Sequence, residues 1–575
     1  MRSLTGTSCR RHSLAAATFV LVSAPTAASA TDWYVRAGAA GGGDGTRAKP
    51  FATIRPAVAA AAVGDRVLVA EGDYAESVSI SEGPSELRGG YASDFASNDP
   101  RAHVTRIRAS GPVGVTFTNA GTTTLSGFVV TGASLHGVQT TGGVPTIEDN
   151  VLERNGSTAA GDRGGGLYTS GGEPHVVRNV VRNNTSGRGA GIAILGGRDY
   201  VVDGNVVEDN VAHGDHGGGL YLNGVGRASN NLVRRNEIGR TLDYGFGGGF
   251  YVFNPNSRAT LSHNVVTQNW AASAGGGEFV DEAATAFLDH ELIYDNEVSQ
   301  RGGAGIYVDG LGEPDGGSKA TLDHCTVAHN KGGTSTGGNG IRIATESQVT
   351  VTNSIFWGNG DDFLVGDPLV RLDMRHSISK EVVSGTGNLQ VDPLFADPDA
   401  GDFHVRSIAG RWDPRSGDGG AWVHDTVSSP AIDSADPAAP FAAERAPNGG
   451  RANLGVYGDT DQASLSGDAA VDALPPAPSD AGVRDATVGP GPDSGGNSSA
   501  RPDGASPTPS DASSDGSVDG SGADTDAPST GGGCRAVPAA DGDGNHAAWI
   551  ALGVFAVAVG VRARSRRATV RSASR

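Results

Sequence analysis

The sequence contains little lysine, cysteine or aromatic residue. Of its 575 residues, 6% are aromatic and three are cysteine. The lysines are Lys49, Lys319, Lys331 and Lys380. Nucleic acids are bound largely through clustered lysine and arginine, so a chain with a net charge of −20 is poorly suited to bind them. We therefore expect no nucleic-acid partner, and a long thin core rather than a globular one.

Glycine is abundant, with 89 residues, and much of it belongs to a phrase repeated between residues 137 and 360. A valine-rich run that ends in asparagine, as in 150–155, is followed by a glycine-rich run such as 164–168. The last glycine of successive runs falls at 166, 191, 219, 249, 277, 305 and 340, in steps of 25 to 35 residues. A period in this range indicates one supersecondary unit per repeat, stacked on its neighbours.

The apolar runs within each repeat are short, β-branched or aromatic, and bounded by Gly, Asn and Asp, which is typical of strands. Coils of such strands stacked in parallel would pair at about 4.8 Å per coil. The terminal asparagines would form an amide ladder between coils, and we expect them to adopt the left-handed conformation of a corner. The repeat therefore predicts an all-β fold, a right-handed single-stranded parallel β-helix (solenoid), over residues 92–386.

The start of the chain has the features of a targeting segment. Residues 1–30 combine a basic pair, an apolar stretch and a small-residue cleavage site that ends at Ala30, which indicates a signal peptide; a buried N-terminal helix is the plain alternative. Within residues 31–91, the apolar positions of 53–62 share one helical face. We expect this short helix to cap the first coils and cover an exposed sheet edge.

Three motifs in this cap follow one another: Pro-Phe-x-Thr-Ile at 50–54, Gly-Asp-x-Val-x-Val at 64–69 and Gly-x-Tyr at 72–74. In this order they resemble the N-terminal capping segment of secreted bacterial β-helix proteins of the pectate-lyase-like superfamily. The resemblance implies the fold and no particular activity.

Residues 387–466 differ in character, and we expect them to form the last coils or a C-terminal cap. Their Asp-Pro, Ser-Pro-Ala-Ile-Asp and Asn-Gly-Gly-Arg motifs resemble the choice-of-anchor region of surface-anchored β-helix proteins. An insertion between Ser407 and Ser428 carries Trp412 and Trp422. We favour loop packing for these tryptophans over a sugar-binding platform.

The remaining sequence predicts how the protein is held. Residues 467–533 are rich in Asp, Ser, Pro and Gly, which predicts a disordered acidic linker. In 534–575, Cys534 precedes the hydrophobic stretch 547–561 and a cluster of arginines. This order resembles the MYXO-CTERM sorting tail, which implies cleavage near Cys534 and attachment to the bacterial cell surface or outer membrane. A plain C-terminal membrane anchor with arginines inside is the alternative.

The part of the chain predicted to be exported and folded cannot form an internal disulfide, because it contains a single cysteine. The first cysteine falls in the predicted signal peptide and Cys534 in the tail, which leaves Cys325 alone between them. We interpret Cys325 as a small interior residue, because it takes the place of an asparagine in its repeat. The folded part must then be held by its core and its hydrogen-bonded ladders.

One set of charged residues falls in register with the glycine runs, and it is the candidate catalytic groove: Asp162, Arg163, Arg188, Asp215 and His216. The superfamily resemblance implies either paired acids, as in hydrolases, or a basic residue with calcium-binding carboxylates, as in lyases. The plain interpretation is that these are solvated corner charges and ion pairs of little energetic worth. We predict no cofactor and no metal, with calcium involved only if the protein is a lyase.

Two functional hypotheses follow. The first is an exported, cell-surface-anchored, non-catalytic scaffold or adhesin-like rod, monomeric, that binds extracellular polysaccharide or a cell-surface partner. The second is a surface-tethered polysaccharide lyase or glycosidase with a groove along the coils. Scarce lysine and missing hydrolase motifs favour the first, and the superfamily resemblance favours the second. An acidic polysaccharide would need a local basic strip or bridging calcium on so acidic a protein.

Overall fold

The computed structural model describes residues 30–467, apart from 82, 241–243, 313–315, 333–336, 367 and 418. The chain splits into two compact units, 1–491 and 492–575, and all described residues lie in the first. The predicted signal peptide before Ala30, the linker and the anchor segment with Cys534 therefore lie outside the described residues. The described part is nearly all β, with the α-helix α1 (Ile54–Ala60) and the 3-10 helix η1 (Pro398–Ala400).

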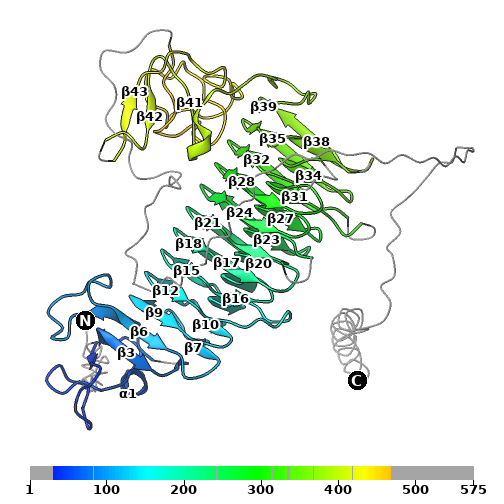
Figure 1. Cartoon of the computed structure of the whole chain (residues 1–575). Coiled ribbons are helices and arrows are strands. Elements are labelled where there is room, and N and C mark those ends of the chain that lie inside the picture. Colours follow the sequence, from blue (N-terminus) through cyan, green and yellow to red (C-terminus); the bar gives the residue numbers. More distant parts are fainter. Residues whose placement is uncertain are drawn as a thin grey trace, which may run out of the picture. The chain divides into compact units, whose positions relative to one another are not determined.

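Three parallel sheets run along the stacked coils (Figure 1). The first has 22 strands in two runs, which share the long strands β17 (Ile192–Asp203) and β20 (Leu220–Ser229). The β2 run consists otherwise of β1 (Asp32–Val35), β2 (Arg66–Ala70), β5 (Glu86–Tyr91), β8 (Thr124–Ser126), β11 (Thr146–Glu148), β14 (His175–Val177), β24 (Arg258–Ser262), β28 (Thr285–Asp289), β32 (Lys319–Asp323), β35 (Gln348–Thr352) and β38 (Arg371–Arg375). The β4 run consists otherwise of β4 (Val78–Ile80), β7 (Val113–Thr118), β10 (His136–Thr141), β13 (Leu167–Ser170), β23 (Phe250–Phe253), β27 (Glu278–Asp281), β31 (Ile306–Val308), β34 (Ile341–Ile343) and β37 (Phe363–Val365).

The second and third sheets are shorter. The twelve-stranded sheet consists of β3 (Gly72–Ala75), β6 (Thr105–Arg108), β9 (Phe128–Thr131), β12 (Val151–Glu153), β15 (Val180–Arg182), β18 (Val206–Glu208), β21 (Leu232–Arg234), β25 (Val265–Thr267), β29 (Leu292–Tyr294), β33 (Thr326–Ala328), β36 (Ile355–Trp357) and β39 (Ile378–Ser379). The five-stranded sheet consists of β16 (Thr185–Ser186), β19 (Val211–Ala212), β22 (Glu237–Ile238), β26 (Trp270–Ala271) and β30 (Glu297–Val298). Each strand pairs with its equivalent one coil away, so the predicted parallel β-helix is confirmed.

The core is a continuous apolar column inside the coils. In the twelve-stranded sheet the middle residue of each strand points inward, and Val181, Val207 and Val233 stack on equivalent positions of successive coils with no exposed surface. Neighbouring residues in each strand point outward, as the two-residue period of a strand requires. The short β-branched runs of the repeat thus supply one interior residue per strand and coil.

Two ladders of buried asparagine line the corners on either side of the twelve-stranded sheet, whereas the repeat predicted only the one formed by the terminal asparagines. In the longer ladder, the Oδ1 of Asn236 accepts hydrogen bonds from the backbone N of Asn210 at 3.2 Å and from its Nδ2 at 2.9 Å. The same pattern runs through Asn155, Asn184, Asn210, Asn236, Asn269, Asn296, Asn330 and Asn359. The shorter ladder consists of Asn150, Asn179, Asn205, Asn231 and Asn264.

The corner conformation falls one residue earlier than predicted. The left-handed backbone belongs to the residue before each ladder asparagine, as in Arg235 (φ 51°) and Gln268 (φ 56°), and the ladder residues do not share it. The ladder amide must point inward along the axis to reach the next coil. The bend is therefore taken by the preceding residue, whose side chain is free to point outward.

The N-terminal end is capped as predicted. Helix α1 buries Ile54, Ala57 and Val58 against the first coils. Its first N–H groups are satisfied by the carboxylate of Glu76, which accepts hydrogen bonds from the N of Ile54 at 2.7 Å and of Arg55 at 3.1 Å. The helix thereby covers the beginning of the core without leaving its own donors unpaired.

Residues 390–466 form a lobe, here called the C-terminal lobe, built on antiparallel pairs and loops. Its strands are β40 (Phe395–Asp397), β41 (Asp402–Val405), β42 (Arg411–Asp413) and β43 (Ala421–Val423). Trp412 and Trp422 are buried against Ala409 and Leu465, which confirms loop packing rather than a sugar platform.

The C-terminal lobe packs on the outer face of the twelve-stranded sheet. Outward side chains such as Leu292 and Ile355 share a hydrophobic cluster with Phe403 and Leu454 of the lobe. Hydrogen bonds join the two parts as well: the Nε2 of His290 donates to the carbonyl of Gly458 at 2.8 Å. Residues more than a hundred positions apart thus meet along this face.

The core contains one pair of carboxyl groups. Glu278 begins β27 at an inward position, and Glu291 occupies the next position of the shorter ladder, where its Oε1 accepts from the Nδ2 of Asn264 at 2.9 Å. Both residues are at most 1% exposed, and three of their four carboxyl oxygens have no hydrogen-bond partner. Burial raises the pKa of both groups, and the charge of Glu278 raises the pKa of Glu291 further.

This pair predicts stability that falls as the pH rises. Above about pH 4.5 the unfolded chain releases protons that the folded pair still holds. The free energy of unfolding therefore decreases as the pH rises. We expect Glu291→Gln to remove one linked proton, and hence up to about 1.4 kcal/mol per pH unit of this dependence. Urea denaturation from pH 5 to 8 measures it. Glu173→Gln, at an exposed turn, is the control; equal pH dependence in the wild type and Glu291→Gln would contradict the assignment.

Candidate functional site

The five residues predicted as a groove lie in register on three successive coils. Arg163 bridges Arg188 in parallel, and the row continues from His216 to Phe246 and Ala274, as the glycine spacing predicted. The carbonyl of Asp162 accepts a hydrogen bond from the N of Arg188 at 2.9 Å. The row lies where the chain enters the strands of the β4 run.

The structure brings three of the five side chains together. The Nε and Nη2 of Arg188 donate to the two carboxylate oxygens of Asp215 at 2.5 and 2.7 Å. The Nδ1 of His216 lies 2.9 Å from Oδ1 of the same carboxylate, at an angle unsuited to a hydrogen bond. The side chains of Asp162 and Arg163 have no hydrogen bond or ion pair within the described part of the chain, and the Nε of Arg163 is buried without a partner.

Burial and pairing act on Asp215 in opposite directions. Burial raises the pKa of Asp215, but its contacts with His216 and Arg188 outweigh this effect and hold the pKa well below its ordinary value. The side chains of Arg188 and Asp215 are 20% and 29% exposed. Asp215 is therefore a fixed anion, and it is unsuited to donating a proton near neutral pH.

A row of aromatic residues, which the sequence analysis did not single out, lies beside this network. Tyr221, Tyr251, Phe279 and Tyr307 occupy equivalent outward positions of β20, β23, β27 and β31, and each is at most 4% exposed. The ring of His216 lies 4.6 Å from that of Tyr251, centroid to centroid. The signal was present in the sequence, because each aromatic residue directly follows an inward residue of the Gly-Gly-Leu-Tyr type and must point outward.

A second carboxylate with the opposite behaviour stands at the end of β27. The hydroxyl of Tyr251 donates to Asp281. Burial raises the pKa of Asp281 to about 6, although the Tyr251 hydrogen bond opposes the shift. Burial, Asp215 and Asp281 raise the pKa of Tyr244, while Arg301 opposes the shift. We name Arg188, Asp215, His216, Tyr251 and Asp281 the charged patch.

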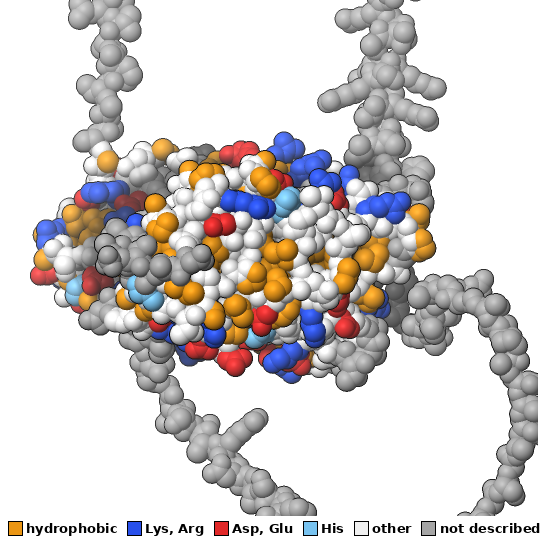
Figure 2. Space-filling view, turned by 90° about the horizontal axis from the view of Figure 1, so that it is seen from above, with side chains coloured by type: hydrophobic (Ala, Val, Ile, Leu, Met, Phe, Trp, Pro, Cys, Tyr) orange, Lys and Arg blue, Asp and Glu red, His pale blue; other side chains and the backbone are white. Residues whose placement is uncertain are grey.

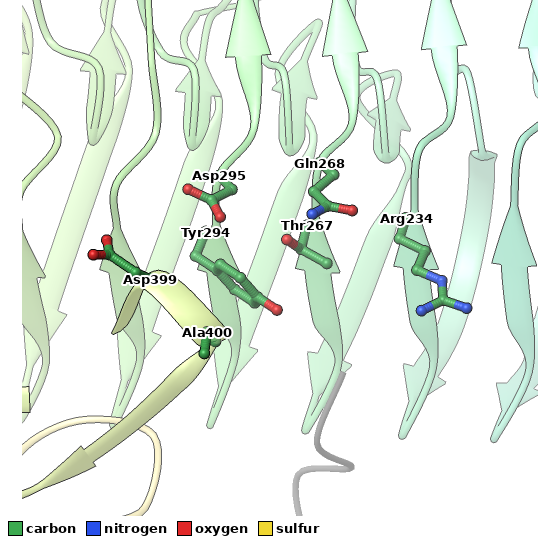
Figure 3. Close-up of a pocket in the computed structure, with 8 residues that line it drawn as sticks. Arg234, Thr267, Gln268, Tyr294, Asp295, Asp399 and Ala400 are labelled. Atoms are coloured by element: carbon green, nitrogen blue, oxygen red, sulfur yellow. The ribbon is translucent and has the colours of Figure 1, made fainter. Parts of the chain in front are cut away.

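A separate groove opens beside the C-terminal lobe (Figure 3). It consists of two adjoining cavities of about 240 and 380 Å³ that share Asp295 and Asp399. Figure 3 shows Thr267, Gln268 and Tyr294 on neighbouring coils, with Asp399 and Ala400 coming from η1. The first cavity is lined by Arg234, Thr267, Gln268, Tyr294, Asp295, Asp399, Ala400 and Gly401. The second is lined by Asp295, His329, Lys331, Gly358 and Asp399.

Three charged side chains of this groove form no hydrogen bond or ion pair among the described residues. No hydrogen bond or ion pair of the side chains of Asp295, Asp399 or Lys331 occurs among the described residues. Burial and the charge of Asp399 raise the pKa of Asp295, while Lys331 and His329 oppose the shift. The groove therefore offers charged groups to a ligand, whereas Arg188 and Asp215 of the charged patch pair with each other.

Neither a membrane-spanning helix nor a metal-binding cluster occurs in the part of the chain that the structure describes. Among residues 30–467, where they are described, no helix is long and apolar enough to cross a membrane. Within the same ranges, no three His, Cys, Asp or Glu side chains gather as metal ligands.

One family model agrees with the fold. A family described as "Right handed beta helix region" matches residues 85–207, 113–280 and 213–367. These matches and the parallel sheets define the protein as a right-handed parallel β-helix. A family described as "Disaggregatase related" matches 376–435. A crystal structure of pectate lyase Pel9A is similar at 12% identity and a TM-score of 0.42, over 74% of this chain and 96% of that one. Curated proteins gave no match.

We expect the free energy of unfolding to decrease when the ion pair of the charged patch is broken. Asp215→Asn should destabilise the fold by roughly 1–3 kcal/mol, between the values for exposed and buried pairs. Because the pKa of Asp215 is lowered on folding, this contribution is present at neutral pH and is lost as the pH falls below about 3.8. Urea denaturation at pH 7 and pH 3 measures it.

The matched control for this prediction is an exposed pair. Asp149 binds Arg178 through both carboxylate oxygens, and each side chain is 47% exposed. Asp149→Asn should cost less than about 1 kcal/mol at pH 7. An equal loss in the two variants would show that Arg188 and Asp215 behave as an ordinary surface pair.

Proposed function

We propose that this β-helix is an exported, cell-surface-anchored scaffold that binds an extended extracellular polysaccharide without cleaving it. The expectation of export and anchoring rests on residues 1–30 and 534–575 of the sequence, with the signal peptide ending at Ala30 and processing near Cys534. The C-terminal segment supplies the attachment to the membrane, and the folded part acts as a monomer. The polysaccharide is held in the groove beside the C-terminal lobe.

One observation carries this proposal: three charged side chains that line the groove form no hydrogen bond or ion pair among the described residues, whereas the charges of Arg188 and Asp215 in the charged patch neutralise each other. Arg188 and Asp215 bind each other through two hydrogen bonds and have little capacity left for a substrate. Asp295, Asp399 and Lys331, in contrast, face two open cavities. A binding site needs such convergent, unsatisfied polar groups.

The shape of the groove favours a polymer. Its lining includes Arg234, Thr267 and Tyr294, the last residues of the successive strands β21, β25 and β29, and His329 after β33. Three steps between coils span roughly 14 Å, enough for more than one sugar unit of a chain lying along the coils. On the face in Figure 2, acidic and basic side chains are interspersed rather than gathered in a basic strip, which disfavours a strongly acidic polymer.

The proposal predicts binding without turnover. The full-length protein, incubated with neutral, acidic and amino polysaccharides with and without calcium, should retain at least one of them. No shortened or unsaturated products should form, as measured by size-exclusion chromatography and by absorbance of unsaturated ends. Ala400→Trp should abolish retention, because Ala400 is an exposed wall of the first cavity. Ala159→Trp, at an exposed site elsewhere, is the control. Retention by Ala400→Trp would contradict the placement, and products would contradict the scaffold.

The charged patch favours a second candidate, a polysaccharide-active enzyme. Its two carboxylates have pKa values shifted in opposite directions: that of Asp281 is about 6 and that of Asp215 is lowered. Such a split is how one site holds a general acid and an anion together. For this candidate, Asp281 would donate the proton and Asp215 would act as the base or charge stabiliser.

This candidate makes a distinct prediction. If products form, Asp281→Asn should abolish their release, because the amide cannot donate a proton of comparable acidity. The rate of the unchanged protein should fall as the pH rises through about 6, where Asp281 loses its proton. Asp199→Asn makes the same charge change at an exposed position of β17 and should have no effect. A rate that increases over this pH range would rule out Asp281 as the acid.

A further inference from the structure

We propose that the groove beside the C-terminal lobe is specific for a polysaccharide that carries unacetylated amino sugars, whose ammonium group lies between Asp295 and Asp399. This inference rests on the proposed function, since it names the class of polymer held in the same groove. The proposed ligand is cationic, whereas the uronates that a basic strip would bind are anionic.

Asp295 is exceptional among the charged residues at its corner. The residues before the longer asparagine ladder include Asp209 and Arg235, which bind each other through two hydrogen bonds at 2.8 and 2.9 Å. Arg154 contacts the carboxylate of Glu153 at 3.3 Å. Asp295 has Gln268 and His329 on the adjoining coils, and its side chain forms no hydrogen bond or ion pair with any residue that the structure describes. Its carboxylate is left available at the point where the two cavities meet.

The C-terminal lobe adds a second carboxylate to the same place. Asp399 lies in η1 and lines both cavities with Asp295. Burial and the nearby Asp399 raise the pKa of Asp295, while Lys331 and His329 oppose the shift, so the negative charge of Asp399 disfavours that of Asp295. A ligand cation between them relieves this repulsion, whereas a ligand carboxylate increases it.

The cations nearby divide the groove into two unlike halves. In the first cavity the guanidinium of Arg234 is bound to Glu208 at 2.8 Å, so its charge is compensated. Lys331 lines the second cavity and not the first. Lys331 and His329 thus offset the charge of Asp295 from the second cavity. On the side of the first cavity the two carboxylates have only the paired Arg234 as a neighbouring cation, and this side is the place for the ammonium group. A chain with a net charge of −20 also attracts a polycation over longer distances.

An unsatisfied buried hydroxyl provides an independent indication of a ligand. Thr267 is 2% exposed and lines the first cavity, and its Oγ1 has no hydrogen-bond partner in the structure. A buried hydroxyl without a partner is costly, and a ligand hydroxyl would satisfy it. Gln268 lines the same cavity and can bond a further hydroxyl. An ammonium group flanked by hydroxyls is the chemistry of an amino sugar.

Isothermal titration of the full-length protein with three oligomers tests the assignment. The oligomers are a hexamer of β-1,4-linked glucosamine, its fully N-acetylated counterpart and an oligogalacturonate of equal length. We expect the glucosamine hexamer to bind most tightly, with an affinity that falls as salt is added. Asp295→Asn and Asp399→Asn should each weaken it by about tenfold or more, as expected for the loss of a charge-assisted hydrogen bond.

The variants are chosen to leave the fold unchanged. Asp295 has a φ of 52°, which asparagine tolerates. Asp199→Asn removes the same charge at an exposed position of β17 with a φ of 48°, and should leave the affinity unchanged. Thr267→Val keeps the shape of the side chain and should weaken binding through the lost hydroxyl alone.

Each outcome decides the assignment. If the N-acetylated hexamer or the oligogalacturonate binds as tightly as the glucosamine hexamer, or if Asp295→Asn binds unchanged, the amino-sugar assignment is wrong while polysaccharide binding by the groove stands. If the glucosamine hexamer does not bind, the assignment is wrong; the wider panel of polysaccharides then decides whether the proposed function fails with it.

Discussion

Hydrogen bonding along the axis of the coils is the constraint on which the rest of this structure depends. Strands pair only with their equivalents one coil away, and the buried amides of residues such as Asn210 and Asn236 repeat that pairing at the corners. Cys325, the one cysteine among the described residues, is free, so no disulfide holds the coils. Each coil must therefore present the same inward residues at the same corners, which is why the sequence repeats.

The shorter ladder ends where the C-terminal lobe begins to contact its corner. After Asn264 the ladder positions are Glu291, Cys325 and Ser354, while the neighbouring residues His290 and Asn353 bond to the lobe. The same few coils thus carry the buried carboxyl pair, the lobe contact and, across the twelve-stranded sheet, the groove. The departures from the repeat mark the part of the solenoid that differs in role from a plain rod.

Much of the fold could be predicted from the sequence because the same pattern of inward and corner residues recurs in successive coils. The asparagine ladder, the capping helix and the register of Arg163, Arg188 and His216 all follow from spacing. The bend before each asparagine could not be predicted, since a strand pattern does not tell which residue of a corner turns. The groove could not be predicted either. Asp295 and Asp399 are brought together by the C-terminal lobe, and no periodic pattern in the sequence indicates where that lobe packs. The pairing of Arg188 with Asp215 depends on side-chain directions that register alone does not fix.

The way the coils stack has a consequence for how proteins of this architecture can change. Inserting or deleting one complete coil between the capping helix and Arg234 would move the two ends apart or together by a single rise, with every other contact kept. Both walls of the groove would travel as one body, because η1 belongs to the lobe and the lobe is bonded to the coils that supply Tyr294 and His329. The length of the solenoid and the chemistry of the groove can therefore evolve separately.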